Sequence, residues 1–342
     1  AAYTVIYPLS LLDALPIYRN GHLSAVSGAN LLVTTTLDNG SGGLYAGGLL
    51  SVSGNQLINQ GGKVGAGSID FSLAGALNNS SGLIEASNTL DIGAASIDNR
   101  SGAIRALGQA PASFARSASP SLMHITSSGL LNNNGGRIEG ATQDFSLQTG
   151  SLQNTGGSVL HVGSGTFGLD LAQAGAAGGS YTSNGSLSYQ AASLTNNAVI
   201  QARNLTLNVG TLNQGSGGQL LAAQTFSGSG GNWSNDGLIA SDGSLGLNLT
   251  GSYTGNGRLS SLGNLSLGAG YIGLIANTSI AGGGTTSVSS SGSLDNSGRL
   301  TSAGNLQVSA GSLNNYGTLG SAGTLRVVSA NLLNQGGLLF SG

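Results

Sequence analysis

A short motif recurs along this chain at nearly constant intervals, and it constrains the fold more than any other feature. The motif is an apolar residue, a variable residue and an asparagine, and glycine or serine follows within three positions. Its first four asparagines, Asn39, Asn59, Asn79 and Asn99, are evenly spaced, with a period of about 20 residues that is typical of solenoid repeats. Apart from one longer interval, later copies follow at steps close to this period or at twice that spacing. A motif that keeps its phase over about 300 residues predicts a repeat protein in which each copy is one structural unit.

The residues between successive asparagines form short segments in which apolar and polar side chains alternate. Residues 57–76 show the pattern, with one alternating segment at 63–66 and a second at 68–73. Alternation with a period of two, bounded by glycine, serine and asparagine, is typical of short β-strands joined by turns. The chain holds 61 glycines in 342 residues, and this density disfavours helices. We therefore expect an all-β protein.

A single repeat of about 20 residues cannot fold by itself. Burying about five apolar side chains contributes roughly 1.5–3 kcal/mol for each. Ordering the backbone costs roughly 1–2 kcal/mol for each residue, so the lost entropy of one repeat outweighs that gain. Stacked repeats add backbone hydrogen bonds between neighbours and enclose a dry interior. We predict a right-handed parallel β-helix of about 20-residue coils, formed as a single domain by residues 21–342.

Stacking places equivalent residues of neighbouring coils ~4.8 Å apart, so the asparagines should form a column. Each side-chain amide can then donate a hydrogen bond to the next amide oxygen, as in cross-β stacks. The alternative is that asparagine stands there because it tolerates the turn conformation. The residues predicted to form the ladder are Asn39, Asn59, Asn79, Asn99, Asn133, Asn154, Asn296 and Asn315. The glycines predicted to supply positive φ at the corner, where a Cβ would clash, are Gly61, Gly62, Gly135, Gly136, Gly336 and Gly337.

Two segments depart from the repeat. Residues 1–20 match no repeat, and the run from Ser10 to Ile17 resembles translated sequencing-adapter text, so we predict that this segment is not native. The one longer interval separates the anchors Ile97 and Leu131. We place the excess near residues 107–121, which include two prolines, and predict a loop insertion there. This loop is either a tolerated insertion or a binding loop.

Composition excludes several classes of partner. The chain has 10 basic and 12 acidic residues and a net charge of −2, so it offers no basic patch for nucleic acid. No apolar run reaches the ~18 residues of a membrane helix, and we expect no membrane insertion. Cysteine is absent, which excludes disulfides and thiolate metal sites.

Candidate catalytic and metal-ligating residues are few. Asp70 and Asp91 should stack on adjacent coils ~5 Å apart, a separation found between the carboxyl groups of retaining glycosidases. Both alternate with apolar neighbours, however, and should therefore face solvent. His22, His124 and His161 do not have the spacing of metal ligands. We expect no catalytic, cofactor-binding or metal-binding residue, and we predict that the protein is not an enzyme.

The full repeat resembles the haemagglutinin repeats of filamentous haemagglutinin and related two-partner-secretion exoproteins. The segment GRLTSAGNLQV at residues 298–308 fits that pattern closely, and the resemblance covers residues 21–342. Contact-dependent growth-inhibition effectors carry similar repeats in their stalks. The resemblance implies export through a dedicated outer-membrane transporter, folding outside the cell, and a secreted or cell-surface location.

By the same resemblance, the expected function is that of the structural shaft of a bacterial adhesin. Its expected partners are the outer-membrane transporter during export and a receptor or glycan on a host or neighbouring cell. Two alternatives stay open: the stalk of a contact-dependent toxin effector and, third, a carbohydrate-active β-helix enzyme that would use Asp70 and Asp91.

Overall fold

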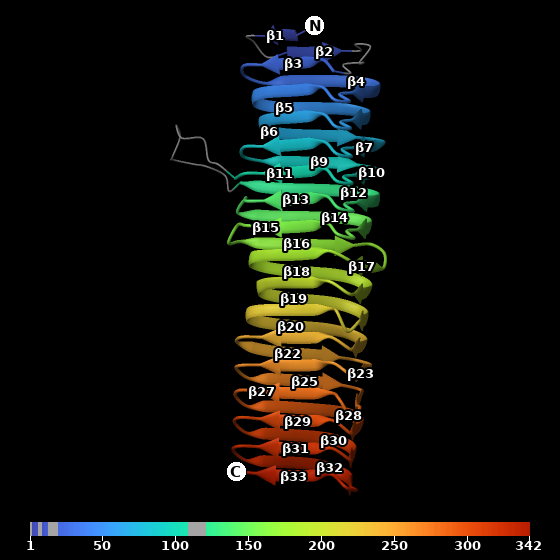
Figure 1. Ribbon diagram of the computed structural model, residues 1–342, viewed down its shortest axis with the longest axis vertical. Coiled ribbons are helices and arrows are strands. Elements are labelled where there is room, and N and C mark those ends of the chain that lie inside the picture. Colours follow the sequence, from blue (N-terminus) through green and yellow to red (C-terminus); the bar gives the residue numbers. More distant parts are fainter. Residues whose placement is uncertain (1, 6–8, 13–19, 109–120) are drawn as a thin grey trace. The chain divides into compact units, whose positions relative to one another are not determined.

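A computed structural model describes residues 2–5, 9–12, 20–108 and 121–342 of the chain. All regular elements within these ranges are β-strands, and no helix occurs among them. The chain divides into two compact units, a first unit at Ala1–Gly185 and a second unit at Ser186–Gly342. Each unit is a parallel β-solenoid in which successive coils stack on one another (Figure 1). The predicted fold class, an all-β solenoid with coils of about 20 residues, is confirmed.

In the first unit, the described strands form three parallel sheets along the stack of coils. The first sheet follows the asparagine corner and contains β1 (Ala2–Val5), β3 (His22–Ala25), the start of β5 (Gly43–Ile58), the start of β6 (Lys63–Leu73), β8 (Leu83–Ala86), β11 (Ala103–Ala106), β13 (Arg137–Gly140), β15 (Ser158–His161) and the start of β18 (Ser180–Asn196). The second sheet contains β2 (Leu9–Leu12), β4 (Ala29–Asp38), later parts of β5 and β6, β9 (Leu90–Ala94), β12 (Leu122–Asn132), β14 (Asp144–Gln153) and β16 (Thr166–Leu171). The third sheet contains the ends of β4, β5, β12 and β14 together with β7 (Ala76–Asn78) and β10 (Ser96–Asp98), and β17 (Gly175–Ala177) follows.

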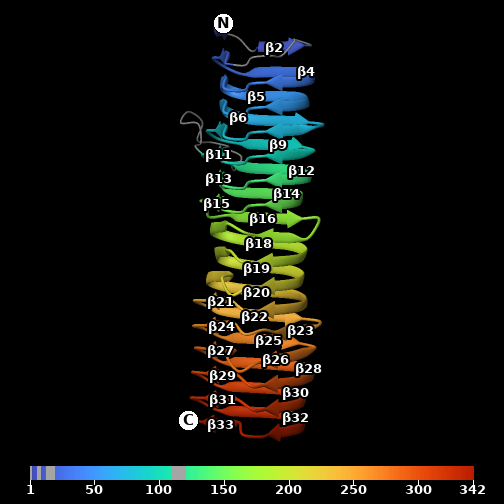
Figure 2. The ribbon, with the colours of Figure 1, turned by 45° about the vertical axis from the view of Figure 1, so that its right-hand side comes forward.

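The second unit repeats the arrangement of three sheets (Figure 2). Two long strands, β19 (Val199–Gln214) and β20 (Gln219–Asn235), each pass through all three sheets. In this unit, the first sheet also contains β21 (Leu238–Ser241), β24 (Arg258–Ser261), β27 (Ser279–Gly282), β29 (Arg299–Ser302), β31 (Thr318–Ser321) and β33 (Leu338–Ser341). The second and third sheets of this unit also contain β22 (Ser244–Leu249), β23 (Ser252–Thr254), β25 (Leu265–Ala269), β26 (Tyr271–Leu274), β28 (Thr286–Asn296), β30 (Leu306–Asn315) and β32 (Leu325–Asn334).

The core of each unit consists of columns of apolar side chains, because like positions of successive coils lie in register. Leu57 lies opposite Leu77, which lies opposite Ile97, and all three are buried. Aromatic residues on successive coils of one column stack. The rings of Phe145 and Phe167 are parallel, and their centroids are 4.5 Å apart. Alternate residues of each strand face outward, as period-two patterning requires. The interior is therefore filled, and any function must use the outer faces or the corners.

The structure describes strands in the first of the two segments that depart from the repeat, residues 1–20, and only the flanks of the second, the insertion near residues 107–121. β1 pairs with β3 and β2 pairs with β4, so strands of the predicted non-repeat segment join the sheets. That residues 1–20 are not native remains a prediction. Residues 109–120 of the predicted insertion lie outside the described residues. The sheets close across the insertion, since Ile97 lies opposite Leu131 and β11 pairs with β13.

One core column in the second unit contains a polar residue. Thr286 stands between Leu265 and Leu306, fully buried, and its hydroxyl has no partner among the described residues. The hydroxyl lies where a Cβ at Gly282 would be. In the next coil the residue opposite Gly282 is Ser302, whose hydroxyl contacts the carbonyl oxygens of Gly284 at 2.7 Å and Asn305 at 2.9 Å. The hydroxyls of Thr286 and Ser302 thus lie at similar places in neighbouring coils. The hydroxyl of Ser302 is hydrogen-bonded, whereas that of Thr286 is not, within the described part of the chain.

We predict that Thr286→Val stabilises the protein by roughly 1–3 kcal/mol, because the change removes an unsatisfied buried hydroxyl and keeps the side-chain shape. The midpoint of urea unfolding should rise. Ser302→Ala serves as the control and should lower the midpoint, since it removes a hydroxyl that is hydrogen-bonded. A lower midpoint for Thr286→Val would contradict this account of the column.

Candidate functional site

A buried ladder of side-chain amides joins the coils of the first unit at one corner. The Nδ2 atom of Asn39 donates to Oδ1 of Asn59 at 2.7 Å, and Asn59 donates to Asn79 in the same way at 2.7 Å. The same 2.7 Å bond links Asn79 to Asn99, Asn99 to Asn133 and Asn133 to Asn154. The bond from Asn99 to Asn133 crosses the insertion, so the ladder is continuous there.

The second amide proton of these asparagines also has a partner. Asn39 Nδ2 lies 3.2 Å from the carbonyl oxygen of Lys63, the first residue of the strand on the next coil, and Asn59 contacts Leu83 in the equivalent way at 3.1 Å. Each of these amides is fully buried. Only Asn39 Oδ1, at the start of the ladder, has no partner among the described residues. Interior members of the ladder are thus satisfied chiefly by neighbouring coils.

The ladder of the first unit ends on a phenol. Asn154 hydrogen-bonds the hydroxyl of Tyr181, a side chain buried in β18, and burial raises the pKa of that tyrosine well above its usual value. The tyrosine hydroxyl takes the place that an asparagine would occupy on the next coil. An amide column can therefore end without leaving its last donor unsatisfied.

The second unit has two shorter ladders. Asn196 Nδ2 donates to Gln214 Oε1 at 3.1 Å, Gln214 donates to Asn235 at 3.0 Å, and Asn235 Nδ2 lies 3.1 Å from the hydroxyl of Tyr253. Burial raises the pKa of Tyr253 to about 12. The other ladder runs from Asn296 to Asn315 and on to Asn334, with 2.7 Å bonds at both steps. The sequence prediction of the ladder did not include four of these residues, although each stands at the asparagine position of the repeat motif: Asn196, Gln214, Asn235 and Asn334.

The corner glycines have two separate roles. The first of each pair, Gly61, Gly135 and Gly336, has φ of 62°, 63° and 70°. The second of each pair, Gly62, Gly136 and Gly337, instead leaves no room for a Cβ, which would overlap the asparagine amides and backbone of the ladder. Ser41, Ser81 and Ser101 hold the first position in other coils, with φ of 54–55°. The first position thus accepts serine at some strain, whereas the second requires glycine for space.

We predict that Asn79→Ala destabilises the protein more than Asn39→Ala does. The interior substitution leaves both Asn59 Nδ2 and Asn99 Oδ1 without their ladder partner, and each such group costs roughly 1–3 kcal/mol. The substitution at Asn39 leaves only Asn59 Oδ1 unpaired and removes an oxygen that already lacks a partner. Urea unfolding monitored by circular dichroism gives both values. Equal losses would contradict this account, because the additional ladder bond broken in Asn79→Ala would then contribute nothing to stability.

The predicted carboxylate pair lies on the outer face of the second sheet. Asp70 lies opposite Asp91, and Asp91 lies opposite His124, whose Nδ1 is 3.2 Å from Asp91 Oδ1. Sequence reasoning missed this contact because the insertion shifts His124 out of phase. The side chain of Asp91 is 62% exposed, so the three residues lack the water-excluded setting that acid–base catalysis uses. Among the described residues, no three His, Cys, Asp or Glu side chains are grouped so that they could hold a metal ion.

His161 ends β15 and is fully buried. Its Nε2 lies 3.2 Å from the carbonyl oxygens of both Thr142 and Gln143, and its Nδ1 lies 2.9 Å from the hydroxyl of Ser183. Carbonyls only accept, so this network assigns the proton to Nε2 and the acceptor role to Nδ1. Desolvation lowers the pKa of His161, while the bonds to the two carbonyls and the charge of Asp144 oppose that shift.

We predict that His161 makes stability depend on pH in mildly acid solution. Because its folded pKa lies below the unfolded value of about 6.5, its contribution is present above that pH and is lost as the pH falls below it. The free energy of unfolding should drop as the pH falls below about 6.5, and His161→Gln should remove most of that drop. His124→Gln is the control and should leave the loss of stability at acid pH in place.

The carboxyls of Asp98 and Asp144 do not account for this loss, because their pKa values are lowered from 3.8 and they titrate at lower pH. An unchanged pH profile in His161→Gln would refute the assignment.

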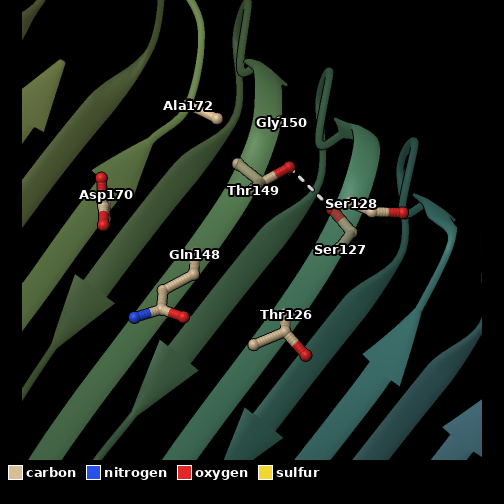
Figure 3. A pocket seen from close by; sticks show the side chains of 8 residues that line it. All are labelled: Thr126, Ser127, Ser128, Gln148, Thr149, Gly150, Asp170 and Ala172. Carbon is tan, nitrogen blue, oxygen red and sulfur yellow. Dashed lines mark hydrogen bonds between the residues drawn. The ribbon is translucent and has the colours of Figure 1, made fainter.

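An open groove lies on the outer face of the second sheet of the first unit, over β12, β14 and β16 (Figure 3). Most of its lining residues are polar, although carbon atoms supply most of its exposed surface. Its volume is about 440 Å³, within the range of small-ligand sites. Thr126, Gln148 and Asp170 project outward from three neighbouring strands, and their backbones are in register. The other lining residues are Ser127, Ser128, Thr149, Gly150 and Ala172. The sequence did not single out this groove, because its residues belong to the variable outward positions.

The amide ladders, the stacked coils and the filled interior define a class of protein: a repeat solenoid whose coils are linked at one corner by buried amides. The haemagglutinin repeat matches residues 24–81, 64–135, 117–176, 172–248, 240–298 and 301–340. The chain therefore belongs to the haemagglutinin repeat family, which confirms the resemblance found in the sequence. Neither a curated protein nor a solved structure matches the chain.

This family is structural and adhesive rather than enzymatic, and its proteins are typically secreted or exposed at the cell surface. Within the part of the chain that the structure describes, no helix is long and apolar enough to cross a membrane.

Proposed function

We propose that this chain is the structural shaft of a secreted or surface-exposed bacterial adhesin. The observation that carries the proposal is the continuous amide ladder of the first unit, which ties six asparagines on successive coils together through 2.7 Å bonds. A shaft works through rigidity, and a buried column whose interior amides are all hydrogen-bonded resists bending and slippage between coils. Membership of the haemagglutinin repeat family supports the same function.

Membership of the haemagglutinin repeat family also supports a route of export. We propose that an outer-membrane two-partner-secretion transporter passes the chain unfolded and that the coils stack outside the cell. The chain lacks cysteine, so no disulfide has to form during this passage. We also propose that residues 21–342 are one repeat domain, and that the insertion near residues 107–121 is an addition to one coil.

The external partner would be a receptor or glycan on a host or neighbouring cell. Outward positions vary from coil to coil while inward positions repeat, so contacts with a partner can change without altering the core. We propose that the chain is not an enzyme, since Asp70 and Asp91 are exposed and His124 is part-exposed beside Asp91. The stalk of a contact-dependent growth-inhibition effector is the second candidate, and similar repeats in such stalks favour it.

The adhesin proposal predicts that beads coated with the purified chain bind epithelial or bacterial cells more than beads coated with albumin. Competition by the soluble chain should abolish that binding. A chain carrying Asn79→Ala and Asn133→Ala, which interrupts the ladder twice, should bind less because the outer faces lose their support. Absence of binding to both cell types would overturn the adhesin function and favour a passive stalk. Release of reducing sugars from polysaccharides, lost in Asp70→Asn and Asp91→Asn, would overturn the non-enzymatic interpretation.

A further inference from the structure

We propose that the groove over β12, β14 and β16 is a binding site for a neutral saccharide chain that lies along the stacking direction of the coils. The site would supply the glycan contact of an adhesin, so this proposal rests on the proposed function. It assigns that contact to three side chains, Thr126, Gln148 and Asp170 (Figure 3).

The spacing of these side chains suits a polymer of sugar rings. Thr126 lies opposite Gln148, and Gln148 lies opposite Asp170, so the three occupy one column on successive coils. Neighbouring strands are ~4.8 Å apart, which is comparable to the length of one pyranose ring in an extended chain. Each ring would then meet one polar side chain. No strand rearrangement is needed, because the column is already formed.

The polar groups of this column are free to bind. No hydrogen bond or ion pair of the Gln148 amide or the Asp170 carboxylate occurs among the described residues, and both side chains are exposed. Thr126 makes only a long contact of 3.4 Å to the carbonyl oxygen of Ile92. Beside the column, the hydroxyls of Ser127 and Thr149 are 2.7 Å apart and buried, which fixes that wall of the groove.

The chemistry of the lining favours a neutral saccharide over other ligands. Together, a carboxylate, an amide and hydroxyls can donate to and accept from the hydroxyl groups of sugars. Asp170 is the only charged residue in the lining, so an anionic sugar would meet repulsion and no compensating cation. A peptide strand could not add to the sheet here, since β12 and β14 both pair with strands on either side.

Two other grooves are less suitable. In the groove over β7, β10 and β12, the Asp98 carboxylate is already paired with Arg100 at 2.7 Å. The groove over β20, β22 and β25 has no charged side chain, and Asn264 Oδ1 there accepts a bond from the backbone N–H of Thr285 at 2.9 Å. Of these three grooves, only the one over β12, β14 and β16 combines a free carboxylate with a free amide.

Saturation-transfer difference NMR on the full chain tests the proposal. The probes are lactose and triacetylchitotriose as neutral saccharides, sialyllactose as an anionic one, and a neutral pentapeptide. We expect signal transfer to at least one neutral saccharide and none to sialyllactose or the peptide. Gln148→Ala should weaken the affinity about fivefold, and Asp170→Asn about tenfold, because a hydrogen bond to a charged group is stronger. Gln307→Ala and Asp70→Asn change outward residues of the same types elsewhere and should leave the affinity unchanged.

The proposal is overturned if no neutral saccharide binds, if sialyllactose or the peptide binds more tightly, or if all four variants bind alike. Adhesion of chain-coated beads to cells distinguishes failure of this saccharide site from failure of the proposed adhesin function. Adhesion that persists unchanged in Gln148→Ala and Asp170→Asn rejects this groove and leaves the adhesin function standing. Loss of adhesion in those two variants but not in the controls supports both.

Discussion

The buried asparagine amide is the constraint on which each solenoid unit depends. An amide shut away from water has two donor hydrogens and an acceptor that all need partners. In the first unit, Asn59 finds its acceptor on the coil after it and its donor on the coil before it. An isolated coil would leave these amide groups unpaired, so the units exist only as stacks. Apolar columns fill the interior, and the amides add a requirement for one particular register between coils, because each donor must meet its acceptor.

This dependence explains how exceptions to the motif are accommodated. Gln214 replaces asparagine and still connects Asn196 to Asn235, since its longer side chain has the same amide. Tyr181 and Tyr253 end two ladders by offering a phenol to the last amide. Each exception keeps the hydrogen bonds and changes the side chain that makes them. Thr286 shows the opposite case, in which a polar residue entered a column and its hydroxyl has no partner among the described residues.

Function is separated from stability by the alternation along each strand. Inward residues and corner residues maintain the stack, while outward residues such as Gln148 and Asp170 contact nothing that the fold requires. Even the corner holding His161 is a structural feature, because its imidazole serves two backbone carbonyls and a serine hydroxyl. Proteins of this repeat family can therefore share one interior and differ in the side chains of their outer faces.

The sequence alone determined the all-β solenoid, the coil length and the family, because a periodic motif such as that of Asn39, Asn59 and Asn79 admits few other structures. It also placed Asp70 and Asp91 on neighbouring coils, since no insertion separates them. Only the tertiary structure decided that Asp91 meets His124 and that Thr126, Gln148 and Asp170 share a groove. The physical reason is that inward positions repeat in every coil, whereas outward contacts depend on insertions and on pairs of neighbours that no periodic pattern records. Likewise, the sequence indicated glycine at the corners, but only backbone geometry separated the need for positive φ at Gly61 from the need for space at Gly62.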